Sequence, residues 1–196
     1  TILSLLLFLT VSVVSFAEAK TVIIGSGNTF KPYCYLDEKG NRAGYEYELL
    51  NEVQKLLPQY KFEYRPAEFK TLLLSLGAGK IDVAAHQIEK NPDREARFLF
   101  GKESYTTFIL RIVVKKDRGD IKGIKDLHGK TVQVSPGTNE AWVLEDYNKK
   151  NGNTIKLVYA SLDYTTLIKN LTDGRIDAFI SITRIVESLN EQFGNK

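Results

Sequence analysis

Apolar residues recur at helical spacing in three stretches of the chain. Leucines and a valine follow this spacing over residues 49–57, and leucines follow it again over residues 72–76. A third stripe covers residues 164–171, for which we expect Ser161 as the N-cap, and glycines follow the last two stretches. Short apolar runs typical of strands separate these helices. The alternation predicts an α/β fold with largely parallel sheets flanked by helices.

The two halves of the chain repeat one motif. The pattern L-x-x-G-[KR]-I-D followed by two apolar residues occurs at 76–84 and again at 171–179. A Lys-Thr-Val triplet that opens an apolar run precedes each copy, at 20–22 and at 130–132. G-[KR]-I-D alone is also a common helix-to-strand turn, but two copies with matching strands upstream indicate duplication or structural pseudo-symmetry.

Two such units in tandem predict two lobes. We assign residues 20–110 to lobe 1 and 111–196 to lobe 2, and we interpret the apolar run 108–115 as the crossover between them. Residues 37–41 predict a hairpin turn in lobe 1 only.

The first nineteen residues predict a secretory signal peptide. An apolar run over 2–14 precedes Ala17-Glu18-Ala19, and cleavage is expected before Lys20. The alternative, a membrane anchor, is weaker because the run is shorter than the ~20 residues that span a bilayer. No Cys adjoins the cleavage site, so a lipid anchor is not supported. We expect a periplasmic or extracellular protein.

Composition narrows the function classes. The net charge is only +3, and basic residues alternate with acidic ones, so no nucleic-acid partner is expected. The only cysteine, Cys34, cannot form an intrachain disulfide and is expected to be buried. Two histidines and one cysteine show no metal-ligand spacing, so we expect no metal and no cofactor.

Ligands of open α/β sheets bind beyond the carboxyl ends of the strands. The candidate segments are therefore 27–33, 68–69, 85–94, 137–140 and 181–183, and residues 86–94 are the richest in polar side chains. Asn91 suits an N-cap, Pro92 the first helical position, and Arg94 then lies in the first turn of a helix. A guanidinium beside free backbone N–H groups can bind a carboxylate or a phosphate. The alternative is an Arg94 paired with a neighbouring acid on a solvated surface.

Residues 137–140 resemble the same arrangement in lobe 2, although an ordinary helix cap would look alike. Phe30 and Phe69 follow predicted strand ends. They either pack in a core or flank the aliphatic part of a ligand beside the anion site.

Taken in order, the motifs resemble family 3 of the bacterial extracellular solute-binding proteins, the polar amino-acid receptors of ABC importers. The motifs that carry the resemblance are Gly44-Tyr45-Glu46-Tyr47-Glu48-Leu49, Gly79-Lys80-Ile81-Asp82, Arg94, Leu127-His128-Gly129-Lys130-Thr131-Val132, Gly137-Thr138 and Gly174-Arg175-Ile176-Asp177-Ala178. The resemblance covers most of residues 20–190. It implies the two-lobed, type II periplasmic-binding-protein fold, each lobe a mixed, mostly parallel sheet. It also implies that lobe 2 is incomplete and that the return segment to lobe 1 is missing.

The resemblance also implies a ligand site between the lobes. Arg94 corresponds to the arginine that grips the ligand α-carboxylate, and Thr138 with Asn139 to the lobe 2 turn that also holds it. Pocket walls and lining fall on Phe30, Phe69, His86, Gln87 and Glu89.

Two positions depart from the family pattern. Glu89 stands where Ser or Thr is usual, and Ile182 stands where an acid usually pairs with the α-ammonium. Either Glu89 or Glu140 holds the ammonium instead, or the ligand lacks a conventional amine. The sequence of residues 89–92, Glu-Lys-Asn-Pro, resembles that of a branch of the family that binds cystine.

The resulting hypothesis is a monomeric receptor that closes around an amino acid such as cystine and presents it to an ABC permease. Related proteins include cyclohexadienyl or arogenate dehydratases, in which Glu89 or Glu140 could supply an acid, and periplasmic sensor domains. No nucleophile–base pair is recognisable, because His86 and His128 lie in different halves. We therefore expect no catalytic residue and no enzyme activity.

Overall fold

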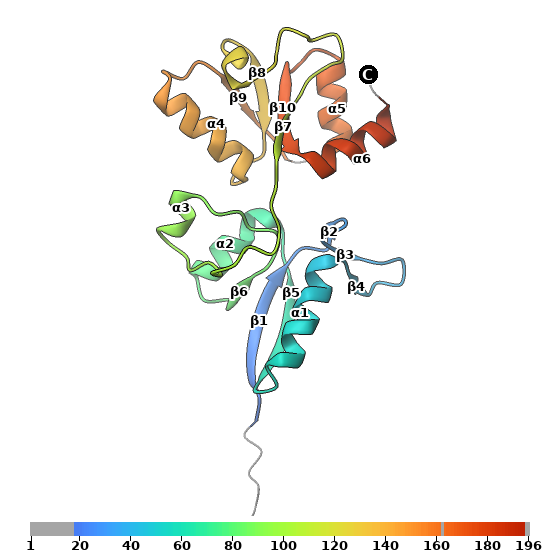
Figure 1. The fold of residues 1–196 in the computed structure, drawn as a ribbon, viewed down its shortest axis with the longest axis vertical. Coiled ribbons are helices and arrows are strands. Elements are labelled where there is room, and N and C mark those ends of the chain that lie inside the picture. Colours follow the sequence, from blue (N-terminus) through green and yellow to red (C-terminus); the bar gives the residue numbers. More distant parts are fainter. Residues whose placement is uncertain (1–17, 162, 195–196) are drawn as a thin grey trace, which may run out of the picture.

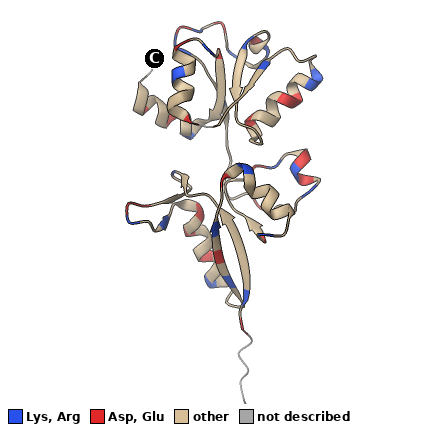
Figure 2. Cartoon of the chain, turned by 180° about the vertical axis from the view of Figure 1, so that it is seen from behind, with Lys and Arg blue, Asp and Glu red and all other residues tan. Residues whose placement is uncertain are grey.

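The computed structural model describes residues 18–161 and 163–194, which form two lobes connected by the extended segment that leads into strand β7 (Figure 1). Most of the predicted signal peptide, residues 1–17, lies outside the described residues. None of the helices described is long and apolar enough to cross a membrane. Basic and acidic residues are interspersed over both lobes (Figure 2).

Lobe 1 is built on a short parallel sheet with the strand order β5-β1-β6. Its strands are β1 (Lys20–Ser26), β5 (Tyr60–Pro66) and β6 (Val83–Ala84). Its helices are α1 (Tyr45–Leu56), α2 (Phe69–Gly77) and α3 (Pro92–Glu95). A separate antiparallel sheet consists of β2 (Thr29–Phe30), β3 (Cys34–Leu36) and β4 (Arg42–Ala43). The predicted hairpin turn at 37–41 is confirmed, because it joins the antiparallel pair β3 and β4.

Lobe 2 contains a four-stranded sheet with the order β7-β10-β8-β9, in which only β7 is antiparallel to its neighbour. Its strands are β7 (Leu110–Val113), β8 (Thr131–Val134), β9 (Lys156–Tyr159) and β10 (Ala178–Ile182). Its helices are the 3₁₀ helix η1 (Ile124–Leu127), α4 (Asn139–Lys150), α5 (Tyr164–Thr172) and α6 (Thr183–Phe193). The chain enters this sheet at β7, which begins at Leu110, the residue predicted to end lobe 1.

Strand β10 is the centre of lobe 2, and all five of its residues are buried. Successive side chains of a strand point to opposite faces. Accordingly, Ala178 and Ile180 pack with Leu144 of α4, whereas Phe179 packs with Leu167 of α5. A strand covered by helices on both faces reads as a continuous apolar run, which is what the sequence contains here.

One predicted helix cap is wrong. The N-cap of α5 is Asp163, whose Oδ1 accepts the N–H of Thr166 at 2.7 Å, and not Ser161. A carboxylate and a hydroxyl are both good caps. Spacing alone could not say which of them begins the helix.

The repeated G-[KR]-I-D motif has the same structural role in both lobes. In lobe 1 the Oδ2 of Asp82 accepts the N–H of Ile23 at 2.8 Å, and the N–H of Asp82 donates to the carbonyl of Ile23 at 2.8 Å. In lobe 2 Asp177 makes the same reciprocal pair with Thr131, at 2.9 and 2.8 Å. Each aspartate thus ties the turn after a helix to the neighbouring strand, at the middle of β1 in lobe 1 and at the first residue of β8 in lobe 2, which gives the sequence repeat a physical reason.

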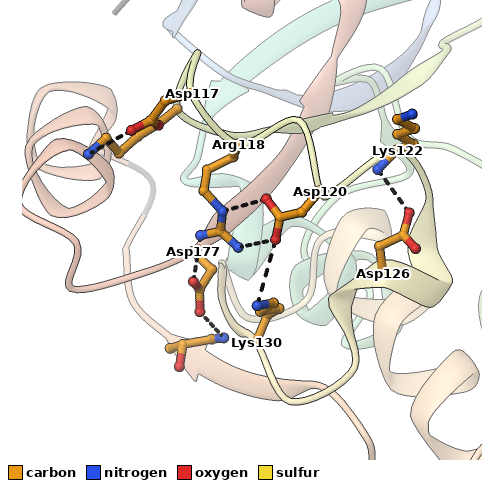
Figure 3. Close-up of polar contacts among 9 residues, drawn as sticks. Asp117, Arg118, Asp120, Lys122, Asp126, Lys130 and Asp177 are labelled. Carbon is orange, nitrogen blue, oxygen red and sulfur yellow. Dashed lines mark hydrogen bonds and ion pairs between the residues drawn. The ribbon is translucent and has the colours of Figure 1, made fainter.

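The copy in lobe 2 carries an additional ionic network (Figure 3). Arg118 donates to Asp177 at 2.8 Å and to both oxygens of Asp120, at 2.8 and 3.0 Å, while Lys130 lies 3.8 Å from Asp120. This network connects the loop after β7 to the turn before β10. It lies in the part of lobe 2 far from lobe 1.

Replacing Asp177 with Asn is expected to reduce the acid sensitivity of stability. The N–H of Thr131, and then Arg118, hold the pKa of Asp177 below its ordinary value. Because the folded pKa is the lower one, the carboxylate stabilises the fold above about pH 4, and this contribution is lost as the pH falls through the folded pKa. Urea denaturation should show wild type more stable by about 1–2 kcal/mol at neutral pH.

The difference between wild type and Asp177→Asn should shrink as the solution is acidified below about pH 4. A difference that stays constant on acidification would contradict this assignment. Asp173→Asn is the matched control, because the Asp173 carboxylate joins only exposed basic partners. Its effect should be small at every pH.

Candidate functional site

A cleft of about 530 Å³ lies between the lobes and is lined by residues of both. Its volume falls in the range typical of small-molecule sites. The lining comes from segments that follow β1, β5 and β6 in lobe 1 and β8, β9 and β10 in lobe 2, as expected for ligand sites of α/β sheets. The cleft brings together nine of the ten predicted ligand-binding residues: Phe30, Phe69, His86, Gln87, Glu89, Thr138, Asn139, Glu140 and Ile182.

An aromatic wall forms the lobe 1 side. The imidazole of His86 stacks on Phe30 with the ring centroids 5.4 Å apart, and it meets Phe69 edge-on at 5.3 Å. Burial lowers the pKa of His86 below its ordinary value, so this wall is uncharged near neutral pH. Gly27 makes the arrangement feasible, because a Cβ there would lie 2.2 Å from His86 Nε2. The wall suits the apolar part of a ligand.

Arg94, the tenth predicted residue, does not line the cleft, but its guanidinium contacts Glu89 and Phe69, which do. The predicted cap is confirmed: Asn91 Oδ1 accepts the N–H of Arg94 at 2.9 Å, and Pro92 opens the helix. The Arg94 side chain is not on a solvated surface, since only 7% of the residue is exposed. Its guanidinium donates to the carbonyl of Glu89 at 2.7 Å and, across the lobes, to the carbonyl of Gly137 at 2.9 Å. The alternative of surface pairing with a neighbouring acid is therefore wrong.

Three carboxylates line the cleft: Glu68 is exposed, whereas Glu89 and Glu140 are half-buried. Burial, and then the charge of Glu140, raise the pKa of Glu89 to about 7. Burial likewise raises the pKa of Glu140. Among the residues that the structure describes, neither carboxylate forms an ion pair with Arg94. Besides the exposed Glu68 and Lys70, the cleft therefore holds two half-buried acids that Arg94 does not neutralise through an ion pair.

The turn before α4 supplies the lobe 2 side. Thr138 caps the helix, because its Oγ1 accepts the N–H of Ala141 at 3.3 Å and donates to the carbonyl of Ser135 at 2.9 Å. Asn139 reaches lobe 1: its Nδ2 donates to Glu89 Oε1 at 3.2 Å, and its Oδ1 accepts from Asn91 Nδ2 at 3.2 Å. The Asn139 side chain thus joins the two lobes and also lines the cleft.

A further contact between the lobes joins Trp142 Nε1 to Asp93 Oδ2 at 3.0 Å. With it, α3 and its flanking residues meet the start of α4 in a continuous row of polar contacts, which we call the seam. The residues of the seam are Glu89, Asn91, Asp93, Arg94, Gly137, Asn139 and Trp142.

Several cleft residues were not predicted from the sequence. These residues belong to no motif: Lys70, Phe108, Ser135, Pro136, Tyr159, Ala160, Ser161, Tyr164 and Ile185. Glu68 and Ser181 also line the cleft, and they belong to the segments 68–69 and 181–183 that were expected from their place after predicted strands. For Trp142 and Asp93 no local pattern distinguishes a contact between lobes from an exposed helix residue.

Other candidate chemistry lies away from the cleft. Cys34 is fully buried, and burial, followed by the charge of Glu46, raises the pKa of its thiol to about 12. His128 contacts the Tyr147 hydroxyl at 2.7 Å within lobe 2. Within the described residues no group of three or more His, Cys, Asp or Glu side chains is placed to hold a metal ion.

Residues 22–150 match the family described as bacterial extracellular solute-binding proteins, family 3. The chain is similar to the L-cystine-binding protein TcyK of Bacillus subtilis, with 41% identity over 89% of this chain and 64% of that protein. It is also similar to TcyJ of the same organism, again an L-cystine-binding protein, with 42% identity over 89% of this chain and 65% of TcyJ.

A solved structure shows the same fold. It is described as a putative L-cystine ABC transporter from Listeria monocytogenes, and it matches with a TM-score of 0.78 and 40% identity over 89% of this chain and 74% of that chain. The two-lobed α/β architecture is that of the type II periplasmic binding proteins. The chain spans somewhat less than two thirds of the length of TcyK and TcyJ.

Proposed function

Because the chain belongs to family 3 of the bacterial extracellular solute-binding proteins, we propose that its cleft captures a small zwitterionic amino acid for an ABC importer. The observation that carries this proposal is the unneutralised set of charges formed by Arg94, Glu89 and Glu140. A guanidinium complements an α-carboxylate, and a carboxylate complements an α-ammonium. A neutral or singly charged ligand would leave part of this set desolvated and unpaired.

L-Cystine is the ligand class that we propose. The relatives TcyK and TcyJ are named for it, and the cleft offers an aromatic wall for a disulfide-bridged stem. Ile182, which is 5% exposed and lines the cleft, provides no charge for an ammonium group. The ammonium contact therefore falls to Glu89 and Glu140.

Arg94 gains a partner when the ligand enters. Its fork of five N–H donors makes two bonds to backbone carbonyls in the structure, and further donors remain for a ligand. A carboxylate is a better acceptor than a neutral carbonyl, because the bond is then charge-assisted on both sides. The ligand carboxylate thus adds ionic contacts to those that already hold the guanidinium between the lobes.

Closure of the lobes follows from the same contacts. Bonds of the seam form only when lobe 1 and lobe 2 approach each other, so they stabilise the closed form. The ligand shifts the equilibrium to the closed form because it contacts Arg94 and the Thr138 turn at the same time. We propose that the permease of the importer recognises this closed form, outside the cytoplasmic membrane, and that the receptor acts as a monomer.

The dehydratase alternative gains no support, since the relatives described above are named as binding proteins or transporters. A single incubation with prephenate and arogenate checks it. If the protein dehydrates either compound, and both Glu89→Gln and Glu140→Gln abolish this reaction, the dehydratase alternative is supported.

The proposed function is tested by a thermal-shift screen of amino acids, including L-cystine, on the full-length protein. A ligand that binds the folded state raises the melting temperature by mass action. We expect L-cystine to give the largest shift and to bind with one-to-one stoichiometry in calorimetry. Failure of every zwitterionic amino acid to raise the melting temperature would refute the proposal.

The only tryptophan of the chain, Trp142, lies in the seam and reports closure. Addition of L-cystine is expected to change its fluorescence in the wild type. Asp93→Ala removes the acceptor of the indole N–H and should weaken ligand binding about fivefold, the effect of one exposed hydrogen bond. Glu95→Ala, an exposed acid on the same short helix, should leave both affinity and fluorescence unchanged. Equal affinities of Asp93→Ala and wild type would show that the seam does not stabilise closure.

A further inference from the structure

The motif at the start of α1 contacts the back of three segments that lobe 1 presents to the cleft. The Tyr47 hydroxyl donates to the carbonyl of Gly27 at 2.9 Å, in the turn that leads to Phe30. The Tyr45 hydroxyl donates to the carbonyl of Tyr105 at 3.0 Å, in the chain that leads to Phe108. Between them, Glu46 reaches the segment 86–89.

Glu46 is a buried carboxylate with a defined set of donors. It is 1% exposed, and its Oε1 accepts the backbone N–H of Gln87 at 3.0 Å and the side-chain Nε2 of Gln87 at 3.2 Å. The Tyr105 hydroxyl also donates to this oxygen. Burying a carboxylate is costly unless it is hydrogen-bonded. The two bonds from Gln87 therefore make the positions of Gln87 and Glu46 depend on each other.

Gln87 has a backbone conformation that needs such support. Its φ is +53°, in the left-handed region that residues other than glycine seldom adopt. Such conformations persist where surrounding contacts over-determine them, and they concentrate at functional sites. The bond from the Gln87 N–H to Glu46 provides this constraint from behind the cleft.

The conformation of Gln87 affects the cleft, because Gln87 and its neighbours His86 and Glu89 line it. Glu46 does not line the cleft. A change of φ at Gln87 would rotate the following chain and displace the Glu89 carboxylate from the lobe 2 turn. The side chain of Glu46 would therefore affect ligand binding without touching the ligand.

We propose that Glu46 is a positioning residue that holds Gln87 in the left-handed conformation and thereby sets the ligand-binding geometry of segment 86–89. This inference rests on the proposed function for its effect on affinity, but the conformational part is independent of any ligand. It assigns a role to an acid of the Gly44-Tyr45-Glu46-Tyr47 motif that lies outside the cleft.

The conformational part is tested by hydrogen exchange of the ligand-free, full-length protein. In Glu46→Ala the amides of residues 86–89 should exchange at least about tenfold faster than in the wild type, because the buried partner of the Gln87 N–H is lost. The amides of β5 should stay protected. Glu48→Ala is the matched control, since Glu48 is an exposed acid in the same first turn of α1. Unchanged protection of 86–89 in Glu46→Ala would overturn the proposal.

Glu46→Leu also removes the acceptor while keeping most of the side-chain volume, and it takes the place of Glu46→Ala if the alanine variant does not fold. A general loss of protection that includes β5 in both variants would mean that Glu46 stabilises the whole lobe, and this too would overturn the positioning role.

Affinity for L-cystine provides the second test, through glycine at position 87. Glu46→Leu should weaken binding about tenfold when residue 87 is Gln or Ala. The same change should cost less than about threefold when residue 87 is Gly, because glycine adopts positive φ without support. An equal loss in the Gln87→Gly and Gln87→Ala backgrounds would overturn the proposal. If the wild type binds no amino acid, the proposed function fails, and hydrogen exchange still decides the role of Glu46.

Discussion

Arg94→Ala is expected to weaken the binding of L-cystine by about 100-fold or more, because a charge-assisted, bidentate pair with the ligand carboxylate is lost. The substitution also removes the bonds to the carbonyls of Glu89 and Gly137. The second of these bonds joins the lobes, so the closed form loses a contact in addition to the ligand contact. Calorimetry at neutral pH measures the change.

Two further variants separate charge from geometry. Arg94→Lys keeps the charge but not the planar fork, and it should recover only part of the affinity, leaving a loss of about tenfold. Arg97→Ala removes an exposed arginine three residues later and should leave the affinity within about twofold of wild type. If Arg94→Ala binds L-cystine as tightly as Arg97→Ala, then Arg94 is not the carboxylate anchor.

Features that depend on neighbouring residues were predictable from the sequence. The cap of α3 by Asn91 with Pro92 next to it follows from the chemistry of helix N-termini, as does the Thr138 cap of α4. The repeated G-[KR]-I-D motif predicted two related lobes, and the reciprocal bonds of Asp82 and Asp177 show why the motif recurs.

Features that depend on contacts between distant segments were not predictable in the same way. The present partner of Arg94 in lobe 2 is a backbone carbonyl, which any residue supplies, so the sequence around Gly137 carries no sign of it. Trp142 and Asp93 meet only because the lobes approach each other. The family resemblance supplied the site near Arg94, whereas the seam became visible only in three dimensions.

The pseudo-symmetry of the two lobes ends at the cleft. Both lobes use the same helix-to-strand tie far from the ligand site, but lobe 1 presents aromatic side chains and Glu89, whereas lobe 2 presents the Thr138 turn and Glu140. Each α-amino acid group of the proposed ligand carries an ammonium and a carboxylate, and an asymmetric cleft can fix the orientation of that group. The repeated architecture thus supplies the scaffold, and the differences between its halves supply the specificity.

Glu89→Gln is expected to weaken the binding of L-cystine about 30-fold at pH 8, because the proposed ammonium contact loses its charge. The pH dependence gives the sharper test. Burial and the charge of Glu140 raise the pKa of Glu89 to about 7. An ammonium group requires the ionised form, so below pH 7 binding must displace a proton. The wild-type affinity should therefore fall by up to about tenfold for each pH unit below 7 and should level off above it.

In Glu89→Gln this dependence should be much weaker between about pH 5.5 and pH 7, since the titrating group is gone and the ligand keeps its charges over that range. Glu140 contributes a residual slope, because burial raises its pKa as well. Glu68→Gln is the matched control: Glu68 lines the same cleft but is exposed, so its removal changes the overall potential without changing the buried contact. A wild-type slope that persists in Glu89→Gln and disappears in Glu140→Gln would move the ammonium site to lobe 2. A slope that persists unchanged in both variants would show that neither Glu89 nor Glu140 alone is the ammonium partner of L-cystine.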